Sequence, residues 1–184
     1  MRSELAIAAD RRVVAGVFRL ADEKAPDVFL AVAERIVAER PDAVVVHAGG
    51  GPCEDDVRRH LDASPHRDRI HLLGRRHDVP TIMAAADVLL LCSTHEGTPN
   101  VLIEAQHLGC PVVSTDAGGA AETFEHGRTG LLCAVGDVDA LAESTLRLLR
   151  DEPLRRAMAE AAPALARERF ALDRMVETTL ACYA

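Results

Sequence analysis

The sequence from Val88 to Gly109 reads V-L-L-L-C-S-T-H-E-G-T-P-N-V-L-I-E-A-Q-H-L-G. Its apolar start, residues 88–92, predicts a buried strand, and the apolar spacing that follows predicts a helix with Thr98 as N-cap and Pro99 as first helical residue. Gly109 is expected to end the helix. The apolar face of this helix is expected to comprise Val101, Leu102, Ala105 and Leu108. Such a strand–loop–helix unit is typical of α/β proteins, in which ligands bind beyond the carboxyl ends of the strands.

Two carboxylates lie on either side of this turn, Glu96 in the loop and Glu104 inside the helix. An ionised carboxylate only accepts hydrogen bonds and can take two hydroxyl groups, while a helix start offers free N–H groups to a phosphate. The pattern therefore predicts a ligand with an anionic middle and hydroxyl pairs on both sides, as in a nucleotide sugar. Two ordinary surface glutamates remain the alternative for this pair alone. The turn residues expected to contact the substrate are Gly97, Thr98, Pro99 and Asn100.

Strands and helices alternate along the whole chain, and most of the strands are continuous apolar runs. The predicted strands are residues 12–18, 43–48, 69–73, 88–92, 111–114 and 129–133. Further helices are predicted at 26–40, 54–63, 79–85, 137–150, 153–169 and 172–183, with one helical turn at 121–125. This order predicts a doubly wound, parallel, six-stranded Rossmann-like sheet. No stretch is rich in Gly, Pro and Ser, so residues 1–184 are expected to form a single domain.

The loops that follow the first five strands should meet at one edge of such a sheet. Their polar or flexible residues are Arg19 and Lys24, the glycines 49–51, Arg75 and Arg76, Glu96, and the glycines 118 and 119. Fixed cations at that edge could stabilise the negative charge of a phosphate group on the ligand. A pair of loop cations is by itself more often a solvated surface feature. The glutamates downstream favour the interpretation as a site.

The segment E-G-T-P-N-V-L-I-E-A, residues 96–105, resembles the signature of the retaining glycosyltransferases of family 4, which have the two-domain GT-B fold. The resemblance implies that Glu96 contacts hydroxyl groups of the donor sugar and that Glu104 holds the ribose hydroxyls. The segment departs from the commonest pattern at Gln106 and His107, where small or apolar residues are usual. His95, beside Glu96, is not expected to be a catalytic base.

A second segment, V-F-R-L-A-D-E-K at residues 17–24, resembles the part of the same family that neutralises the donor diphosphate. It implies that Arg19 and Lys24 take this role, so that Arg19, Lys24 and Glu96 form the catalytic set. Phe18 and Ala25 stand where the family usually has glycine.

Three further loops resemble the family more weakly. Gly50 lies in a glycine-rich turn that could equally be a tight strand-to-helix connection. Arg76, in G-R-R-H-D-V-P, is the candidate contact to the nucleotide base. Gly118 and Gly119, in G-G-A-A-E, match a glycine pair followed by a glutamate, here Glu122, which either orders the loop near the sugar or caps a helix.

The resemblance implies that this chain is the C-terminal, donor-binding half of a hexosyltransferase of carbohydrate biosynthesis, with UDP as the commonest donor nucleotide. The acceptor site would lie on a missing N-terminal domain, against which a helix at about 172–183 would pack. The chain alone is expected to bind the nucleotide weakly and to transfer sugar poorly or not at all. A GT-B nucleotide-sugar epimerase fragment and a non-catalytic nucleotide-binding module are the alternatives.

The amino-acid composition excludes several classes of ligand and partner. The formal net charge is −8 and no Trp is present, which argues against a nucleic-acid ligand. The five cysteines form no C-x-x-C pair and the histidines are scattered, so neither a metal nor another cofactor is expected. Cys92, Cys110 and Cys133 are interpreted as buried apolar residues. No transmembrane run or signal peptide is recognised, so a cytoplasmic location is expected, and the full enzyme could still associate peripherally with a membrane.

Overall fold

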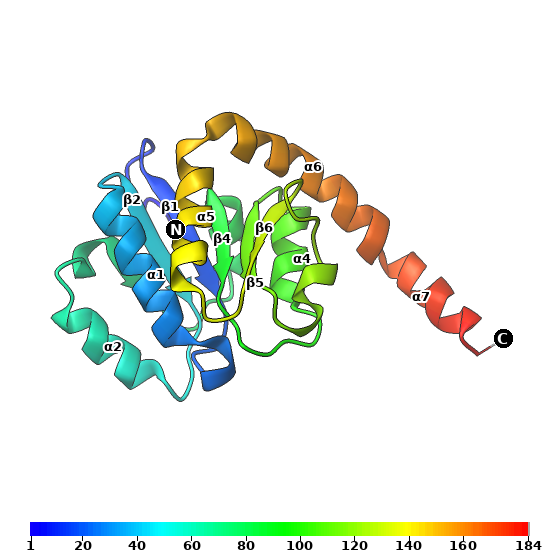
Figure 1. Ribbon diagram of the computed structural model, residues 1–184, viewed down its shortest axis with the longest axis horizontal. Coiled ribbons are helices and arrows are strands. Elements are labelled where there is room, and N and C mark those ends of the chain that lie inside the picture. The colour runs from blue at the N-terminus through cyan, green and yellow to red at the C-terminus, as the bar shows by residue number, and fades with distance from the viewer. Residues whose placement is uncertain (184) are drawn as a thin grey trace.

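The computed structural model describes residues 1–183, which form one six-stranded sheet between two layers of helices (Figure 1). The strand order is β3-β2-β1-β4-β5-β6, and every pairing is parallel. The strands are β1 (Arg12–Val17), β2 (Ala43–Ala48), β3 (Ile70–Leu72), β4 (Val88–Leu91), β5 (Val112–Thr115) and β6 (Gly130–Cys133). The doubly wound six-stranded sheet predicted from the sequence is therefore confirmed.

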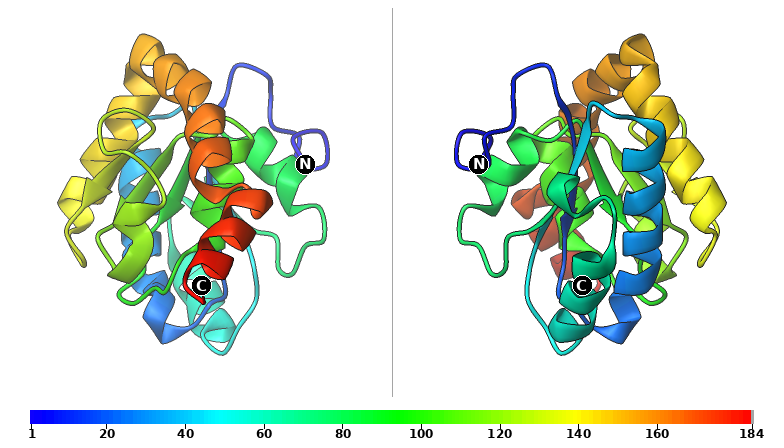
Figure 2. Two further views of the ribbon diagram at one scale, coloured as in Figure 1. Left: turned by 90° about the vertical axis from the view of Figure 1, so that its right-hand side faces the viewer. Right: turned by 90° about the vertical axis from the view of Figure 1, so that its left-hand side faces the viewer.

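Seven helices cover the sheet or extend from it in the described part of the chain. They are α1 (Pro26–Glu39), α2 (Glu54–Ala63), α3 (Val79–Ala84), α4 (Asn100–His107), α5 (Val138–Arg150), α6 (Glu152–Phe170) and α7 (Leu172–Ala181). On one face α1 packs against α2 and α5, and on the other α4 packs against α3 and α6 (Figures 1 and 2). This arrangement is the doubly wound architecture of sheets that bind ligands where the strand order reverses.

The apolar runs become strands because both of their faces are covered. Every residue of β2, β4 and β5 is buried. The central strand β1 aligns Val14 with Val45 of β2 on one side and with Val88 of β4 on the other. Side chains from both faces of these strands therefore pack against helices, which explains why hydrophobic residues do not alternate with polar ones.

Cysteines contribute to this core. Cys92, Cys110 and Cys133 are buried, as the sequence predicted. Burial raises the pKa of the Cys110 thiol to about 12, because an apolar environment disfavours the thiolate. At neutral pH these side chains therefore act as small apolar groups.

The turn after β5 differs from its prediction. A 3-10 turn spans Gly118–Glu122, three residues earlier than the helical turn expected at 121–125. It begins where Gly118 has a φ of +54°, a conformation that favours glycine, and the Thr123 hydroxyl closes it by donating to the Ala120 carbonyl at 2.7 Å. Because the turn starts at residue 118 and not at 121, it includes both Gly118 and Gly119.

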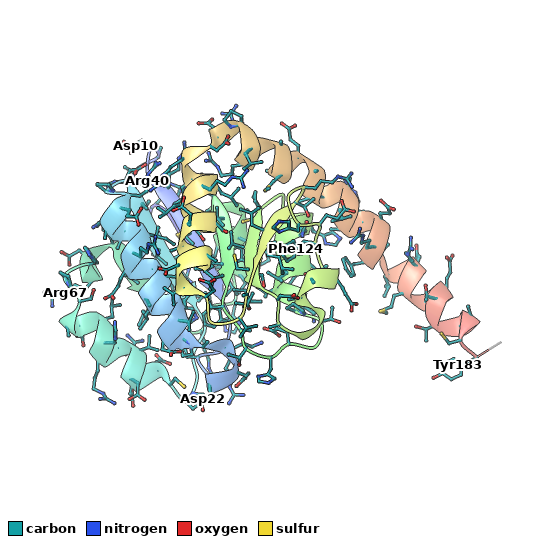
Figure 3. All side chains as sticks on the ribbon, in the orientation of Figure 1. Asp10, Asp22, Arg40, Arg67, Phe124 and Tyr183 are labelled. Atoms are coloured by element: carbon teal, nitrogen blue, oxygen red, sulfur yellow. The ribbon has the colours of Figure 1, made fainter. Side chains whose placement is uncertain are left out.

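The last helix, α7, lies outside the compact body. It continues from α6 after a break at Ala171 and extends away from the sheet, with Tyr183 beyond its end (Figure 3). Its large apolar side chains are exposed: Leu172 by 68%, Met175 by 59% and Leu180 by 65%. In residues 1–183, no helix is both long enough and apolar enough to cross a membrane.

A charged cluster joins β1, β4 and α6 at the amino ends of the strands. Asp87, just before β4, accepts a hydrogen bond from the Val13 backbone N–H at 2.8 Å and one from Arg12 Nη1 at 3.1 Å. Arg155 of α6, whose side chain is only 9% exposed, brings its Nε within 3.5 Å of the same carboxylate. These contacts tie the buried strands to a covering helix at the amino edge of the sheet. The carboxyl edge, described below, is on the opposite side.

His47, near the end of β2, is a buried titratable group in the core. Its ring packs edge-on against Phe18 and Phe29, with centroid distances of 4.5 and 5.6 Å. Burial is the main cause that lowers the pKa of His47 from 6.5 to about 4. The folded chain therefore keeps this imidazole neutral at pH values where the unfolded chain protonates it.

This shift predicts a loss of stability in mild acid. Between pH 6.5 and 4 the unfolded state binds more protons at His47, so the free energy of unfolding falls as the pH falls through that window. Urea unfolding of the wild type should give a free energy of unfolding about 1 kcal/mol lower at pH 5.5 than at pH 7.5 from this residue alone. His47→Leu should flatten the pH profile by that amount. Parallel profiles for the two proteins would contradict the prediction.

Candidate functional site

The strand order reverses between β1 and β4, and the loops that follow these strands lie next to each other. Helices α1 and α4, which leave these loops, run on opposite faces of the sheet. A crevice between them is the expected ligand position in a sheet of this kind. Figure 3 shows Asp22, in the loop after β1, at the end of the molecule opposite Asp10 and Arg40, so the site lies at the carboxyl edge.

Lys24 and Glu96 meet across this boundary. Lys24 Nζ lies 2.5 Å from Glu96 Oε1, and their side chains are 21% and 7% exposed. The Thr94 backbone N–H also donates to the Glu23 carbonyl at 2.8 Å, which joins the two loops a second time. A cation and a carboxylate from segments far apart in the sequence thus form one charged pair at the switch point.

Ser93 is a residue of this cluster that the sequence analysis missed. Its side chain is fully buried, and its hydroxyl donates to Glu96 Oε1 at 2.6 Å. The Thr115 hydroxyl of β5 in turn donates to the Ser93 carbonyl at 2.6 Å. Within residues 1–183 no hydrogen bond reaches Glu96 Oε2, so that oxygen is the one that can accept from a ligand hydroxyl. A serine directly after an apolar strand, three residues before Glu96, was the available signal.

Gly118 and Gly119 pack directly on the backbone of the Glu96 turn. The Gly119 N–H donates to the Gly97 carbonyl at 3.0 Å. A Cβ on Gly118 would lie 1.9 Å from the Glu96 carbonyl oxygen, and one on Gly119 would lie 2.4 Å from that of Gly97. Only glycine permits this approach, so the loop after β5 fixes the backbone that carries Glu96.

The start of α4 differs from the sequence prediction. Pro99 is the N-cap, the helix begins at Asn100, and no side chain of the described residues caps it. The expected capping role of Thr98 is therefore wrong, because the extended backbone of Pro99, with ψ at 96°, delays the first helical residue by one. Uncapped N–H groups at this helix start remain suited to an anion.

Glu104 lies one turn into α4 with an exposed side chain. Leu102 and Ala105 of the same helix are fully buried, as predicted. Leu108 is 42% exposed, so its assignment to the apolar face is wrong. It is the C-cap of α4, and helical spacing puts it on the same edge of the helix as the partly buried Val101 and the exposed Glu104.

Arg19 and Gly50 are brought together by contacts between the loops after β1 and β2. The Leu20 N–H donates to the Gly50 carbonyl at 3.2 Å, and the Cys53 N–H donates to the Leu20 carbonyl at 3.0 Å. A Cβ on Gly51 would lie 2.2 Å from the Leu20 oxygen. The glycine turn thus lies against the loop that presents the exposed Arg19.

Arg76 is held by two carboxylates. Its guanidinium donates to both oxygens of Asp78, at 2.8 and 2.9 Å, and to both oxygens of Glu4, at 2.7 and 2.9 Å. Hydrogen bonds from Arg76 lower the pKa of Asp78 to about 2. A residue committed to two ion pairs has little hydrogen-bonding capacity left for a nucleotide base, so the structure does not favour the role expected for Arg76.

A cavity of about 560 Å³ lies beside the site rather than in it. It opens between the starts of α1 and α2, and its lining includes Asp22, Asp56 and Thr94 but not the charged site residues. At the sheet edge itself, Arg19 and Glu104 are exposed, whereas the Lys24 and Glu96 side chains are only 21% and 7% exposed. In the described part of the chain, no three or more His, Cys, Asp and Glu side chains are grouped to hold a metal ion.

Comparison with known proteins extends this picture. The family model described as glycosyl transferases group 1 matches residues 1–165. N-acetyl-alpha-D-glucosaminyl L-malate synthase of Bacillus anthracis is 36% identical over 142 residues, which cover 77% of this chain and 37% of that enzyme.

Two solved structures are similar to the whole domain. HepE of Anabaena, solved in complex with UDP-glucose, is 30% identical with a TM-score of 0.84, and the match covers 98% of this chain and 51% of that one. The C-terminal domain of the group 1 glycosyl transferase LpcC of Francisella tularensis, at 21% identity and a TM-score of 0.80, has the same fold over 88% of both chains. The chain therefore spans about a third to a half of the full-length relatives described here.

Proposed function

The chain belongs to the group 1 glycosyl transferases, and from this membership we propose that it is the donor-binding domain of a retaining glycosyltransferase. The complete enzyme transfers a hexose from a nucleoside diphosphate sugar to an acceptor. HepE, which is 30% identical, has been solved with UDP-glucose, and this supports UDP as the donor nucleotide.

The pairing of Lys24 with Glu96 across the switch point is the observation that carries this proposal. It puts a cation and a hydroxyl acceptor side by side, 2.5 Å apart, where a diphosphate would join a sugar. Lys24 and Arg19 stabilise the negative charge on the leaving nucleoside diphosphate. Glu96, held by Ser93 through one oxygen, accepts from a sugar hydroxyl with the other. Glu104, exposed on α4, accepts from both ribose hydroxyls.

The proposed partner is a second domain that carries the acceptor site. The chain covers 37% of the Bacillus enzyme and 51% of HepE, which leaves room for such a domain in a longer protein. The exposed apolar side chains of α7, Leu172, Met175 and Leu180, are proposed to pack against it. Arg19 and Glu104 are exposed at the same edge of the sheet, which supports a cleft closed by that domain.

Calorimetric titration with UDP, GDP and ADP tests the proposal on this chain. UDP should bind best, and Glu104→Ala and Arg19→Ala should each weaken it about tenfold, because each removes a charged hydrogen-bonding group. Glu160→Ala, which removes an exposed glutamate from α6, is the matched control and should change little. Failure of all three nucleotides to bind at millimolar concentration, or equal losses in the control, would contradict the donor site.

A further inference from the structure

The loops at the carboxyl edge present four cations, and only some of them are neutralised. Lys24 pairs with Glu96, and Arg76 pairs with Asp78 and Glu4. Arg19 and Arg75 are both exposed, and within residues 1–183 neither has a carboxylate within 4.0 Å. Two arginines therefore remain available to an anion at this edge.

Arg75 is positioned by the contact between the loops after β2 and β3. It follows Gly74, whose carbonyl accepts from the Gly49 N–H at 2.8 Å. A Cβ built on Gly50 would lie 3.3 Å from Arg75 Cγ and 3.5 Å from its Nε. The side chain thus lies across Gly50, where the absence of a side chain leaves it room.

The same glycine turn is in contact with the loop that carries Arg19. The Gly50 carbonyl accepts from the N–H of Leu20, the residue after Arg19. The Arg75 side chain and the backbone beside Arg19 therefore lie against the same glycine turn, through loops that follow β3 and β1. A guanidinium offers only donors and binds phosphate oxygens in pairs, which suits both residues to an oxyanion at this position.

One carboxylate is close enough to compete. Glu54 Oε2 would lie 3.0 Å from a Cβ on Gly50, on the same side as Arg75. Its other oxygen accepts from Arg58 at 2.7 Å, and this bond is the main cause that lowers the pKa of Glu54. Arg75 adds a weaker Coulombic attraction to Glu54, but within residues 1–183 it makes no hydrogen bond or ion pair with that carboxylate, so its donors stay free for a ligand.

We propose that Arg75 is a third cation of the diphosphate-binding site, acting with Arg19 and Lys24. The inference rests on the proposed function and adds a residue to it. It also assigns the loop after β3 a phosphate contact, through Arg75, in place of the base contact that Arg76 was expected to make.

Titrations with uridine, UMP and UDP separate a phosphate contact from a base contact. Arg75→Ala should weaken UDP about tenfold, weaken UMP less, and leave uridine within about twofold. Arg75→Lys should recover part of the loss, because it restores the charge without the paired donors. The difference between wild type and Arg75→Ala should shrink at high salt, because an exposed contact is screened.

Arg67→Ala is the control for net charge, since Arg67 is an exposed arginine in the turn before β3, whereas Arg75 follows that strand. It should bind UDP as the wild type does, and thermal unfolding should show that all variants are folded. Equal losses for uridine and UDP, or an unchanged UDP affinity, in Arg75→Ala would overturn the inference. If wild type does not bind UDP, the proposed function fails first; if Arg19→Ala weakens UDP and Arg75→Ala does not, only the inference fails.

Discussion

Gly118→Ala is expected to lower the free energy of unfolding by about 2–4 kcal/mol and to weaken UDP-glucose binding more than tenfold. The new Cβ would lie 1.9 Å from the Glu96 carbonyl oxygen, so the loops after β4 and β5 must separate. The φ of +54° adds the usual penalty of a left-handed conformation for alanine. Because the clash falls on Glu96 itself, the carboxylate should leave its position beside Lys24. Urea unfolding and calorimetry measure the two effects separately.

Gly136→Ala separates backbone strain from the clash. Gly136 also has a positive φ, +77°, but a Cβ there would meet nothing within 4 Å. Its replacement should cost only about 1 kcal/mol. If Gly118→Ala is no less stable than Gly136→Ala, the close packing of the two loops does not contribute to stability as argued.

Asp87→Ala should be the most destabilising single replacement at the other edge of the sheet, lowering the free energy of unfolding by about 3–5 kcal/mol. It leaves Arg155, 9% exposed, without a carboxylate at 3.5 Å, and it removes the acceptor of the Val13 N–H. A buried charge without a partner costs more than the pair contributes when intact. Equilibrium unfolding in urea at neutral pH measures this loss.

Two variants test the cause of that loss. Asp87→Asn keeps an acceptor for Val13 but removes the charge, so its stability should lie between the wild type and Asp87→Ala. Glu152, whose side chain is 42% exposed, lies 3.3 Å from Arg12 and is its other carboxylate partner. Glu152→Ala should therefore lower the free energy of unfolding by less than about 1 kcal/mol. An Asp87→Ala protein within 1 kcal/mol of the wild type would show that the cluster is not energetically important.

One edge of the sheet holds contacts that stabilise the fold, and the opposite edge holds the charged residues of the proposed binding site. The Asp87 cluster fixes β1, β4 and α6 where the strands begin. At the other edge, Lys24 and Glu96 remain partly accessible, and Arg19 and Glu104 are exposed. Under the proposed function, the charges that bind a diphosphate and hydroxyl groups are thus kept on short loops supported by a rigid core.

Much of the fold could be predicted because its signals are local. Largely apolar runs such as residues 43–48 and 88–92 predicted β2 and β4, since strands covered on both faces need no polar alternation. Boundaries were less exact, as the start of α4 shows, because one extended residue at Pro99 moves the helix start without changing the pattern. The parallel topology also predicted that the loops of Arg19, Lys24 and Glu96 would share an edge.

The sequence by itself therefore determined the order of strands and helices, the doubly wound sheet, and the edge at which the charged loops gather. Only the tertiary structure decided which of the charged side chains pair. Lys24 pairs with Glu96, and Glu4 pairs with Arg76; the two residues of each pair are 72 positions apart in the sequence. Arg75, next to Arg76, has no such partner within residues 1–183 and stays available to a ligand. Ser93 holds the Glu96 carboxylate, and Thr115 of β5 holds Ser93 in turn; folding brings these residues together. Secondary structure follows local periodicity, whereas an ion pair depends on distances of a few ångströms between segments that only the packed core brings together.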